Sequence, residues 1–140
     1  MSTATNVALA RRFWDGLNKR DLGVVDECLA EDFVWLVRPG KTMDRRAFKA
    51  VLAALLTMFP DLRLIEDHMV AAKRDSVAIR FVAVGTDVNA CLQMPQTGKR
   101  LAIDQAYFMR FRDGKMQELR SYASGTGFGA GVTSNQGWSS

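Results

Sequence analysis

The feature that most constrains the fold is a change in hydrophobic periodicity at Pro60. Before Pro60, apolar residues recur at intervals of three and four, which is typical of helices with one buried face. After Pro60, apolar and polar residues alternate, which is typical of strands with one buried face. Because the helices come first and most strands follow, we predict an α+β fold in which helices pack on one face of a curved, mostly antiparallel sheet.

The expected elements follow from this pattern and from the residues that break it. Asp21 is the expected N-cap of a short second helix, Pro39-Gly40 is expected to close the first strand, and Asp113-Gly114 predicts a hairpin turn. The full set comprises helices over 6–18, 21–29 and 44–57, a strand over 33–37 before the third helix, and strands over 63–71, 76–87, 101–112 and 115–124. Such an arrangement leaves a concavity between sheet and helices, where small-molecule pockets commonly lie.

A chain of 140 residues with 48% hydrophobic residues is long enough for one domain with its own core. We assign this domain to residues 1–124. Residues 125–140 carry no charge and are rich in glycine and serine, which predicts a flexible tail that Phe128 or Trp138 can anchor.

The charge pattern argues against a nucleic-acid partner. The chain has 19 Lys and Arg against 15 Asp and Glu, a net charge of +4, and its basic residues form short pairs spread along the sequence. One histidine and two separated cysteines do not match a zinc site, and no glycine-rich phosphate-binding loop occurs. We therefore expect no nucleic acid, no metal and no cofactor.

The sequence also argues against a membrane span or a secreted protein. No apolar run approaches the roughly 20 residues that cross a bilayer, and the N-terminus lacks the basic region of a secretory signal. Cys28 and Cys91 are far apart and have no CxxC partner. We interpret them as two buried thiols of a cytoplasmic protein, with a disulfide between them as the alternative.

Alternation along residues 101–112 (LAIDQAYFMRFR) singles out Gln105. Charged residues occupy even positions, whereas apolar and aromatic residues occupy odd ones, so Gln105 and Tyr107 are expected to share the inward face. A buried amide without a partner costs about 1–3 kcal/mol. Gln105 is therefore expected to bind a ligand or water or, as the alternative, to be a core glutamine bonded to its neighbours.

Asp87 ends the predicted strand 76–87 and has the same parity as its apolar stripe, which comprises Val77, Ile79, Phe81 and Ala83. A carboxylate at the end of such a stripe suits a general acid or base that works near neutral pH. The alternative is that the strand ends at Gly85, which would make Asp87 a solvated loop residue.

Two further questions stay open. His68 is either a structural histidine or a catalytic one. The last strand lacks clean alternation, so either Ser121 or the pair Tyr122 and Ser124 faces inward.

Four segments carry a family resemblance. They are RRFWDGLNKRDLGVVDECLAEDFVW near the N-terminus, FPDLRL before the strand at 63–71, MPQTGKRL before the strand at 101–112, and FMRFRDGKMQE through the last hairpin. Over about residues 6–124 the chain resembles the SnoaL-like polyketide cyclases of the nuclear transport factor 2-like superfamily. The resemblance implies a cone-shaped α+β barrel, but no single reaction, because this fold hosts isomerases, cyclases, hydrolases, dehydratases and non-catalytic binders.

The resemblance carries over the catalytic pattern of aldol cyclases only in part. Their fourth strand presents a glutamine, which is Gln105 here, and a histidine, whose position holds Tyr107. The catalytic aspartate of their last strand falls at Ser124, and an asparagine of their first strand falls near Trp35.

Two related enzyme groups also match incompletely. Compared with ketosteroid isomerases, the oxyanion-binding tyrosine falls at Phe13 and the second oxyanion acid at Tyr107. Compared with limonene epoxide hydrolases, one aspartate matches Asp87, but the arginine before it is Gly85 and the other aspartate is Ser121.

Taken together, the residues and the resemblance predict a cofactor-independent polyketide cyclase or isomerase that acts by acid/base chemistry on a hydrophobic carbonyl compound. Gln105 and Tyr107 would donate hydrogen bonds to a carbonyl oxygen, Asp87 would abstract a proton, and His68 is the second-choice base. The expected substrate contacts are Phe13, Trp35, Met109, Tyr122 and Ser124. The alternatives are a hydratase or epoxide-opening hydrolase of the same fold and a non-catalytic small-molecule-binding module.

The outer face of the sheet predicts a homodimer. Val82, Val84 and Phe108 are expected to point away from the helices, and an exposed apolar patch of this kind commonly marks an interface. Members of the superfamily that the chain resembles often pair through this face.

Overall fold

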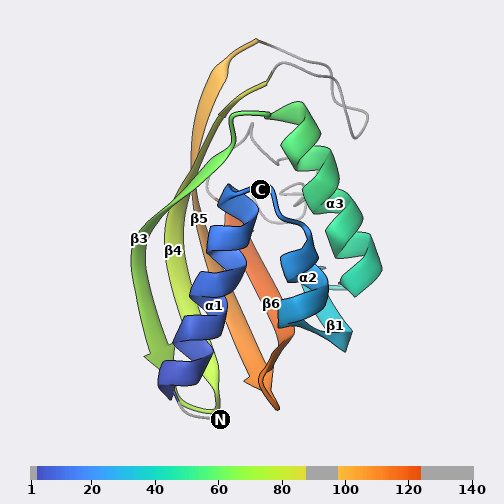
Figure 1. Ribbon diagram of the computed structural model, residues 1–140, viewed down its shortest axis with the longest axis vertical. Coiled ribbons are helices and arrows are strands. Elements are labelled where there is room, and N and C mark those ends of the chain that lie inside the picture. The colour runs from blue at the N-terminus through green and yellow to red at the C-terminus, as the bar shows by residue number, and fades with distance from the viewer. Residues whose placement is uncertain (1–2, 88–97, 124–140) are drawn as a thin grey trace.

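The computed structural model describes residues 3–87 and 98–123. Three helices cover one face of a curved, six-stranded sheet (Figure 1). This is the α+β fold that the change of periodicity predicts. In chain order the elements are α1 (Thr3–Asn18), α2 (Gly23–Cys28), β1 (Leu29–Arg38), β2 (Lys41–Asp44), α3 (Arg45–Met58), β3 (Arg63–Ala72), β4 (Ser76–Thr86), β5 (Arg100–Arg112) and β6 (Lys115–Ala123).

The strands lie in the order β2-β1-β6-β5-β4-β3. Only β1 and β6 run parallel, and every other neighbouring pair is antiparallel. The described strands form an open, curved sheet with β2 and β3 at its edges. The β5–β6 hairpin turns at Asp113 and Gly114, whose φ angles of 52° and 76° match the tight turn that this dipeptide favours.

The core lies between the helices and the covered face of the sheet. Phe48 of α3 occupies its centre and contacts the rings of Phe13, Phe33 and Trp35, with centroid separations of 5.0–6.4 Å. Buried aromatic rings of this size contribute much of the apolar area that stabilises a small domain. Across residues 3–87 and 98–123, every helix is too short or too polar to traverse a lipid bilayer.

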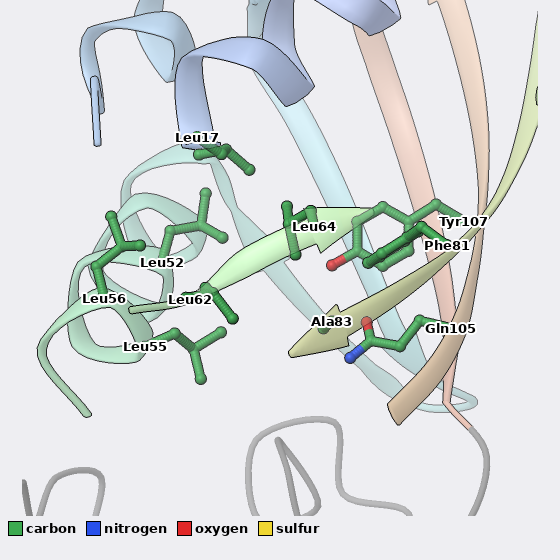
Figure 2. A pocket seen from close by; sticks show the side chains of 10 residues that line it. All are labelled: Leu17, Leu52, Leu55, Leu56, Leu62, Leu64, Phe81, Ala83, Gln105 and Tyr107. Carbon is green, nitrogen blue, oxygen red and sulfur yellow. The ribbon is translucent and has the colours of Figure 1, made fainter. Parts of the chain in front are cut away.

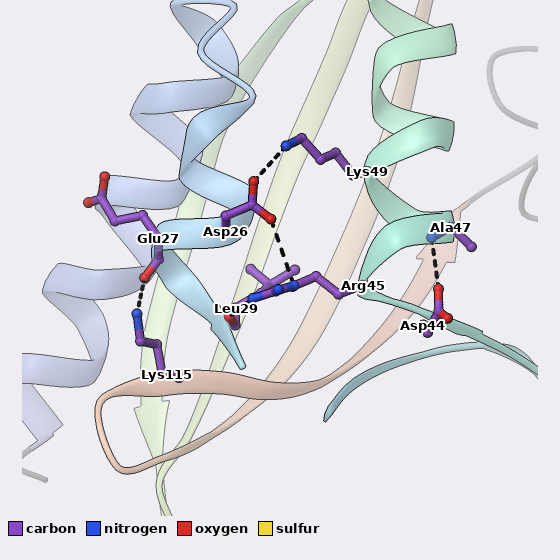
Figure 3. Close-up of polar contacts among 8 residues, drawn as sticks. All are labelled: Asp26, Glu27, Leu29, Asp44, Arg45, Ala47, Lys49 and Lys115. Carbon is purple, nitrogen blue, oxygen red and sulfur yellow. Dashed lines mark hydrogen bonds and ion pairs between the residues drawn. The ribbon is translucent and has the colours of Figure 1, made fainter. Parts of the chain in front are cut away.

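Polar contacts at the helix ends set the position of α3 (Figure 3). Asp44 caps the helix, because its Oδ1 accepts a hydrogen bond from the Ala47 N–H at 2.8 Å. Asp26 of α2 pairs with Lys49 at 2.6 Å and with Arg45 at 3.8 Å, and the hydrogen bond from Lys49 holds the pKa of Asp26 below its usual value. These ion pairs are exposed, so they orient α2 against α3 more than they stabilise the fold.

Of two local predictions, the N-cap of the second helix is wrong and the end of the first strand is confirmed. The second helix begins at Gly23 with Leu22 as its N-cap, and Asp21 instead accepts a hydrogen bond from the Gly23 N–H at 2.9 Å in the preceding turn. Pro39-Gly40 closes the first strand as expected, since β1 ends at Arg38, and the chain turns back there into β2, which pairs with β1. Gly40 supports this turn with a φ of 82°, which glycine adopts without strain.

Candidate functional site

A pocket lies between α3, the end of α1 and the covered face of the sheet (Figure 2). Its cavity has a volume of about 40 Å³, within about 420 Å³ of unfilled space that is partly open to solvent. Ten side chains line it: Leu17, Leu52, Leu55, Leu56, Leu62, Leu64, Phe81, Ala83, Gln105 and Tyr107. Eight of the ten are apolar, so the pocket suits a hydrophobic molecule with one polar edge.

The periodicities of α3 and β5 explain why these residues meet. Leu52, Leu55 and Leu56 recur at the helical spacing and turn one face of α3 toward the sheet. On β5, alternation turns Gln105 and Tyr107 to the same covered face. The two polar residues therefore lie opposite a wall of leucine side chains.

Gln105 and Tyr107 are the polar groups of the pocket, and both side chains point into it (Figure 2). Gln105 is only 8% exposed. Within residues 3–87 and 98–123, the hydrogen bonds of the protein leave both the Gln105 amide and the Tyr107 hydroxyl without a partner. Desolvation by burial raises the pKa of Tyr107, so the phenol is neutral at physiological pH and can donate a hydrogen bond.

Two aromatic rings fix the position of Tyr107. The centroid of its ring lies 5.1 Å from that of Trp14 and 5.0 Å from that of Phe81, both in edge-to-face arrangements. Trp14 and Phe81 contact each other in the same way at 5.1 Å. Because three mutually packed rings restrict each other's rotamers, the hydroxyl of Tyr107 is held toward the pocket.

Polar contacts of Asn18 and Asp61, which sequence reasoning missed, hold the segments that border the pocket. Asn18 clamps the main chain of Leu64, donating to its carbonyl at 3.0 Å and accepting from its N–H at 2.8 Å. Asp61 accepts hydrogen bonds from the N–H and hydroxyl of Thr86 at 2.7 and 2.9 Å and pairs with Arg100 at 3.3 Å. The bonds from Thr86 hold the pKa of Asp61 below its usual value. The only feature of the sequence that pointed to Asp61 was its place in the FPDLRL segment.

The two candidate bases lie apart from this pocket. Asp87 follows the last residue of β4 and is only 4% exposed, which excludes a fully solvated position, yet it is not among the lining residues. Its main chain pairs with Lys99 and Gly98 at 3.0 and 2.7 Å. His68 is exposed on β3 and lies opposite Arg80 on the outer face of the sheet, because the strand bulges between Glu66 and His68. The helices cover the other face, so His68 points away from the pocket.

Three of the expected substrate contacts are core residues instead. Phe13, Trp35 and Met109 are 0–2% exposed and do not line the pocket. They face inward as the periodicity predicts, but their rings and side chains are enclosed by other core residues. Trp35 Nε1 donates to Ser121 Oγ at 2.8 Å, which also settles that Ser121 is the inward residue of β6.

Tyr122 does not line the pocket. Because neighbouring residues of a strand face opposite sides, Tyr122 lies on the outer face, where its ring contacts Phe108 at 5.7 Å. It is on the wrong side of the sheet for a ligand in this pocket. Ser124 and the tail after it lie outside the described residues, as does Cys91, whereas Cys28 is a free, buried thiol.

No cluster of His, Cys, Asp and Glu with the geometry of a metal site occurs in the described part of the chain. The lining of the pocket consists of apolar groups, one amide and one phenol. The chemistry that this arrangement supports is hydrogen-bond donation to an oxygen atom inside an apolar environment.

The fold and the site define an α+β protein whose helices cover one face of an open sheet, with a largely apolar pocket between them. The family comparison is more specific. Residues 10–119 match the SnoaL-like domain, and the chain belongs to this family. No curated protein matches the chain.

Solved structures show the same fold. AclR, a proposed hydroxylase from Streptomyces galilaeus, superposes with a TM-score of 0.79 at 24% identity and covers 88% of this chain and 91% of its own. A proposed SnoaL-like polyketide cyclase from Jannaschia gives 0.78 at 19% identity, with 86% of each chain covered. IdmH, a proposed polyketide cyclase from Streptomyces antibioticus, gives 0.73 at 24% identity and covers 94% of this chain and 99% of its own.

Proposed function

We propose that this protein binds a hydrophobic carbonyl compound in the pocket and acts on it as a cofactor-independent cyclase or isomerase. One observation carries the proposal: two polar side chains, Gln105 and Tyr107, are directed into an apolar pocket and make no hydrogen bond to the described protein. A carbonyl oxygen of a bound ligand would accept from both. Membership of the SnoaL-like family supports the reaction class.

The proposed reaction begins with loss of a proton from the carbon next to the carbonyl group. Asp87 is the proposed base; it does not line the pocket, but it follows β4 four residues after the lining residue Ala83, and its side chain would have to turn toward the ligand to take this proton. The electron pair of the broken C–H bond moves onto the carbonyl oxygen, and Gln105 Nε2 and Tyr107 Oη stabilise the resulting enolate by donating hydrogen bonds. In a cyclisation, the enolate carbon then forms a bond to a second carbonyl carbon of the same molecule. In an isomerisation, the proton returns to a different carbon.

A second candidate function is binding without catalysis. It is favoured by the absence of any carboxylate or imidazole among the described side chains that line the pocket. Tyr107 cannot replace the base, because its raised pKa keeps the phenol protonated. The two functions share the same ligand site and differ only in whether Asp87 exchanges a proton with the ligand.

Deuterium exchange separates these functions without knowledge of the natural substrate. The probe is 2-tetralone, a hydrophobic bicyclic ketone with acidic protons next to its carbonyl, and NMR follows their replacement in D₂O. We expect the wild-type protein to accelerate the exchange and Asp87→Asn to abolish the acceleration. Asp104→Asn is the matched control, because Asp104 is an exposed carboxylate on β5. Binding of the ketone with no acceleration by the wild-type protein would favour the non-catalytic function.

We also propose that the protein is a cytoplasmic homodimer that pairs through the outer face of its sheet. On this face Phe108 of β5 is 51% exposed and Ile65 of β3 is 48% exposed. Val82 of β4, the strand between them, is half-buried and lies opposite Ile65. Apolar groups grouped on one face commonly mark an interface. Sedimentation at micromolar concentration is expected to give twice the 15.6 kDa chain mass, and a single species of the chain mass would contradict the proposal.

A further inference from the structure

Strand β4 extends beyond the start of its neighbour β3, and this extension leads to Asp87. β3 begins at Arg63, which is two residues short of the position that would pair with Thr86. On its other side β4 stays bonded to the chain before β5, since the Asp87 N–H donates to the Lys99 carbonyl at 3.0 Å. Because successive N–H groups of a strand point to opposite neighbours, the N–H of Thr86 faces the side on which β3 has not yet begun.

The side chain of Asp61 occupies the place of the missing strand. Its Oδ1 accepts a hydrogen bond from the Thr86 N–H at 2.7 Å, and its Oδ2 accepts one from the Thr86 hydroxyl at 2.9 Å. The same carboxylate pairs at 3.3 Å with Arg100 of β5, which lies opposite Thr86. The bonds from Thr86 hold the pKa of Asp61 below its usual value, so the carboxylate is ionised at neutral pH and keeps these contacts.

Phe59 holds the same end of β4 from the covered face of the sheet. A side-chain carbon added to Gly85 would lie 3.0 Å from Phe59 Cβ, so the phenylalanine rests directly on the glycine. The Phe59 N–H donates to the Leu55 carbonyl of α3 at 2.9 Å, and the Phe59 carbonyl accepts from the Leu62 N–H at 2.9 Å. The turn that contains Asp61 is therefore fixed both to α3 and to the end of β4.

These contacts keep the alternation of β4 intact as far as Asp87. Ala83 and Gly85 are buried, and Thr86 is half-buried. Asp87 continues this alternation, being 4% exposed. Ala83 lines the pocket, so Asp87 leaves the strand on the face that carries the pocket. Fraying of the strand at Thr86 would remove the constraint that directs Asp87 to this face.

We infer that Asp61 is a positioning residue for Asp87: its carboxylate substitutes for a strand and holds the end of β4, which keeps Asp87 on the covered face. The inference rests on the proposed function, in which Asp87 takes the proton from the ligand. Asp61 does not line the pocket, so it acts through the main chain of Thr86 and not on the ligand.

Saturation kinetics of 2-tetralone proton exchange test this role. Asp61→Ala removes all three contacts of the carboxylate and should lower the maximal rate by about 10- to 100-fold, because a shift of about 1 Å in a reacting group has an effect of this size. The ketone concentration that gives half the maximal rate should stay within about threefold of the wild-type value, since the lining residues are unchanged. Asp61→Asn keeps an oxygen that can accept from the Thr86 N–H and should restore most of the rate.

Asp44→Ala is the matched control. Asp44 is also an exposed aspartate whose Oδ1 accepts a main-chain N–H, at 2.8 Å, but it lies at the start of α3. This variant should lower the melting temperature without lowering the maximal rate. Amide hydrogen exchange followed by NMR gives a readout that does not depend on activity. The Thr86 amide should exchange at least about tenfold faster in Asp61→Ala than in the wild type and should be unchanged in Asp44→Ala.

The outcomes separate the inference from the proposed function. A wild-type maximal rate in Asp61→Ala, or equal losses of rate in Asp61→Ala and Asp44→Ala, would overturn the inference and leave the proposed function in place. Unchanged exchange of the Thr86 amide in Asp61→Ala would also overturn it. No acceleration of 2-tetralone exchange by the wild-type protein would contradict the proposed function itself, and the inference with it.

Discussion

Two polar pairs lie on the covered face of the same sheet, and they differ in how their hydrogen bonds are satisfied. Trp35 and Ser121 bond to each other at 2.8 Å in the core beside β1 and β6. Gln105 and Tyr107 lie next to each other in the alternation of β5, but neither bonds to the other or to the remaining described residues. Both pairs are enclosed by apolar side chains.

The difference separates a structural pair from a functional one. A buried donor that loses its partner costs about 1–3 kcal/mol, so the Trp35–Ser121 bond contributes to stability. Gln105 and Tyr107 make no such contribution, and their polar atoms remain available to a ligand in the pocket. Stability and ligand binding should therefore respond to different substitutions.

The largest expected effect is on catalysis. Gln105→Leu and Tyr107→Phe should each lower the rate of 2-tetralone proton exchange by about 10- to 1,000-fold, because donors directed at developing negative charge act mainly in the transition state. Ser121→Ala is the control and should leave the rate unchanged. Full activity in both pocket variants would remove these two residues from the mechanism.

The second largest effect is on stability, where the substitution of Ser121 should matter and the substitution of Gln105 should not. Ser121→Ala should lower the free energy of unfolding by about 1–3 kcal/mol, since it leaves Trp35 Nε1 buried without an acceptor. Gln105→Leu should leave this free energy unchanged or raise it, because it replaces an unbonded amide by an apolar side chain. Urea denaturation of the three proteins measures both quantities. A Gln105→Leu protein as destabilised as Ser121→Ala would show that Gln105 has a structural role.

Substitution of Trp35 and of Trp14 tests the same distinction between bonded and unbonded polar groups, with a smaller expected change in the free energy of unfolding. Trp35 donates a hydrogen bond, whereas Trp14 Nε1 is buried with no hydrogen-bond partner among the described residues. Trp→Phe removes a similar amount of ring at both positions. Because only Trp35→Phe also breaks a bond and strands Ser121, it should destabilise the protein by about 1 kcal/mol more than Trp14→Phe. Equal losses in urea denaturation would contradict this assignment.

The smallest expected effect is a dependence of stability on alkaline pH. Burial raises the pKa of Tyr107 above its ordinary value of 10.0. Above about pH 10 the unfolded phenol ionises while the folded one stays protonated, so the folded state binds more protons and stability falls as pH rises. Below pH 10 this contribution is constant. Tyr107→Phe should therefore show a shallower loss of unfolding free energy above pH 10 than the wild type, and parallel curves would contradict the burial of the phenol.

Hydrophobic periodicity was sufficient to predict the sheet-and-helix architecture and the inward faces of β4 and β5. Those strands are long, and their alternation is strict, so Gln105 was identified as an inward amide from the sequence alone. The four-residue strand β2 escaped prediction because it lies at the edge of the sheet and only Met43 is partly buried, which leaves no pattern to detect.

The candidate site was less predictable for a geometric reason. Alternation tells which side of a sheet a residue faces, but not whether the side chain reaches a cavity or the packed core. Phe13 and Trp35 face inward and are enclosed by the core, whereas the less prominent Leu62 and Leu64 line the pocket. The orientation of Ser121 depends on a bulge between Arg110 and Phe111, which shifts the pairing of β5 with β6 and has no signature in the local sequence.

A crystal structure of the protein with bound 2-tetralone tests the central claim most directly. We expect the ring system to lie against the leucine side chains of α3, with the carbonyl oxygen about 2.7–3.2 Å from Gln105 Nε2 or Tyr107 Oη. A ketone bound at another surface, or bound in the pocket with its oxygen directed away from both residues, would contradict the claim that these two groups are retained for the ligand.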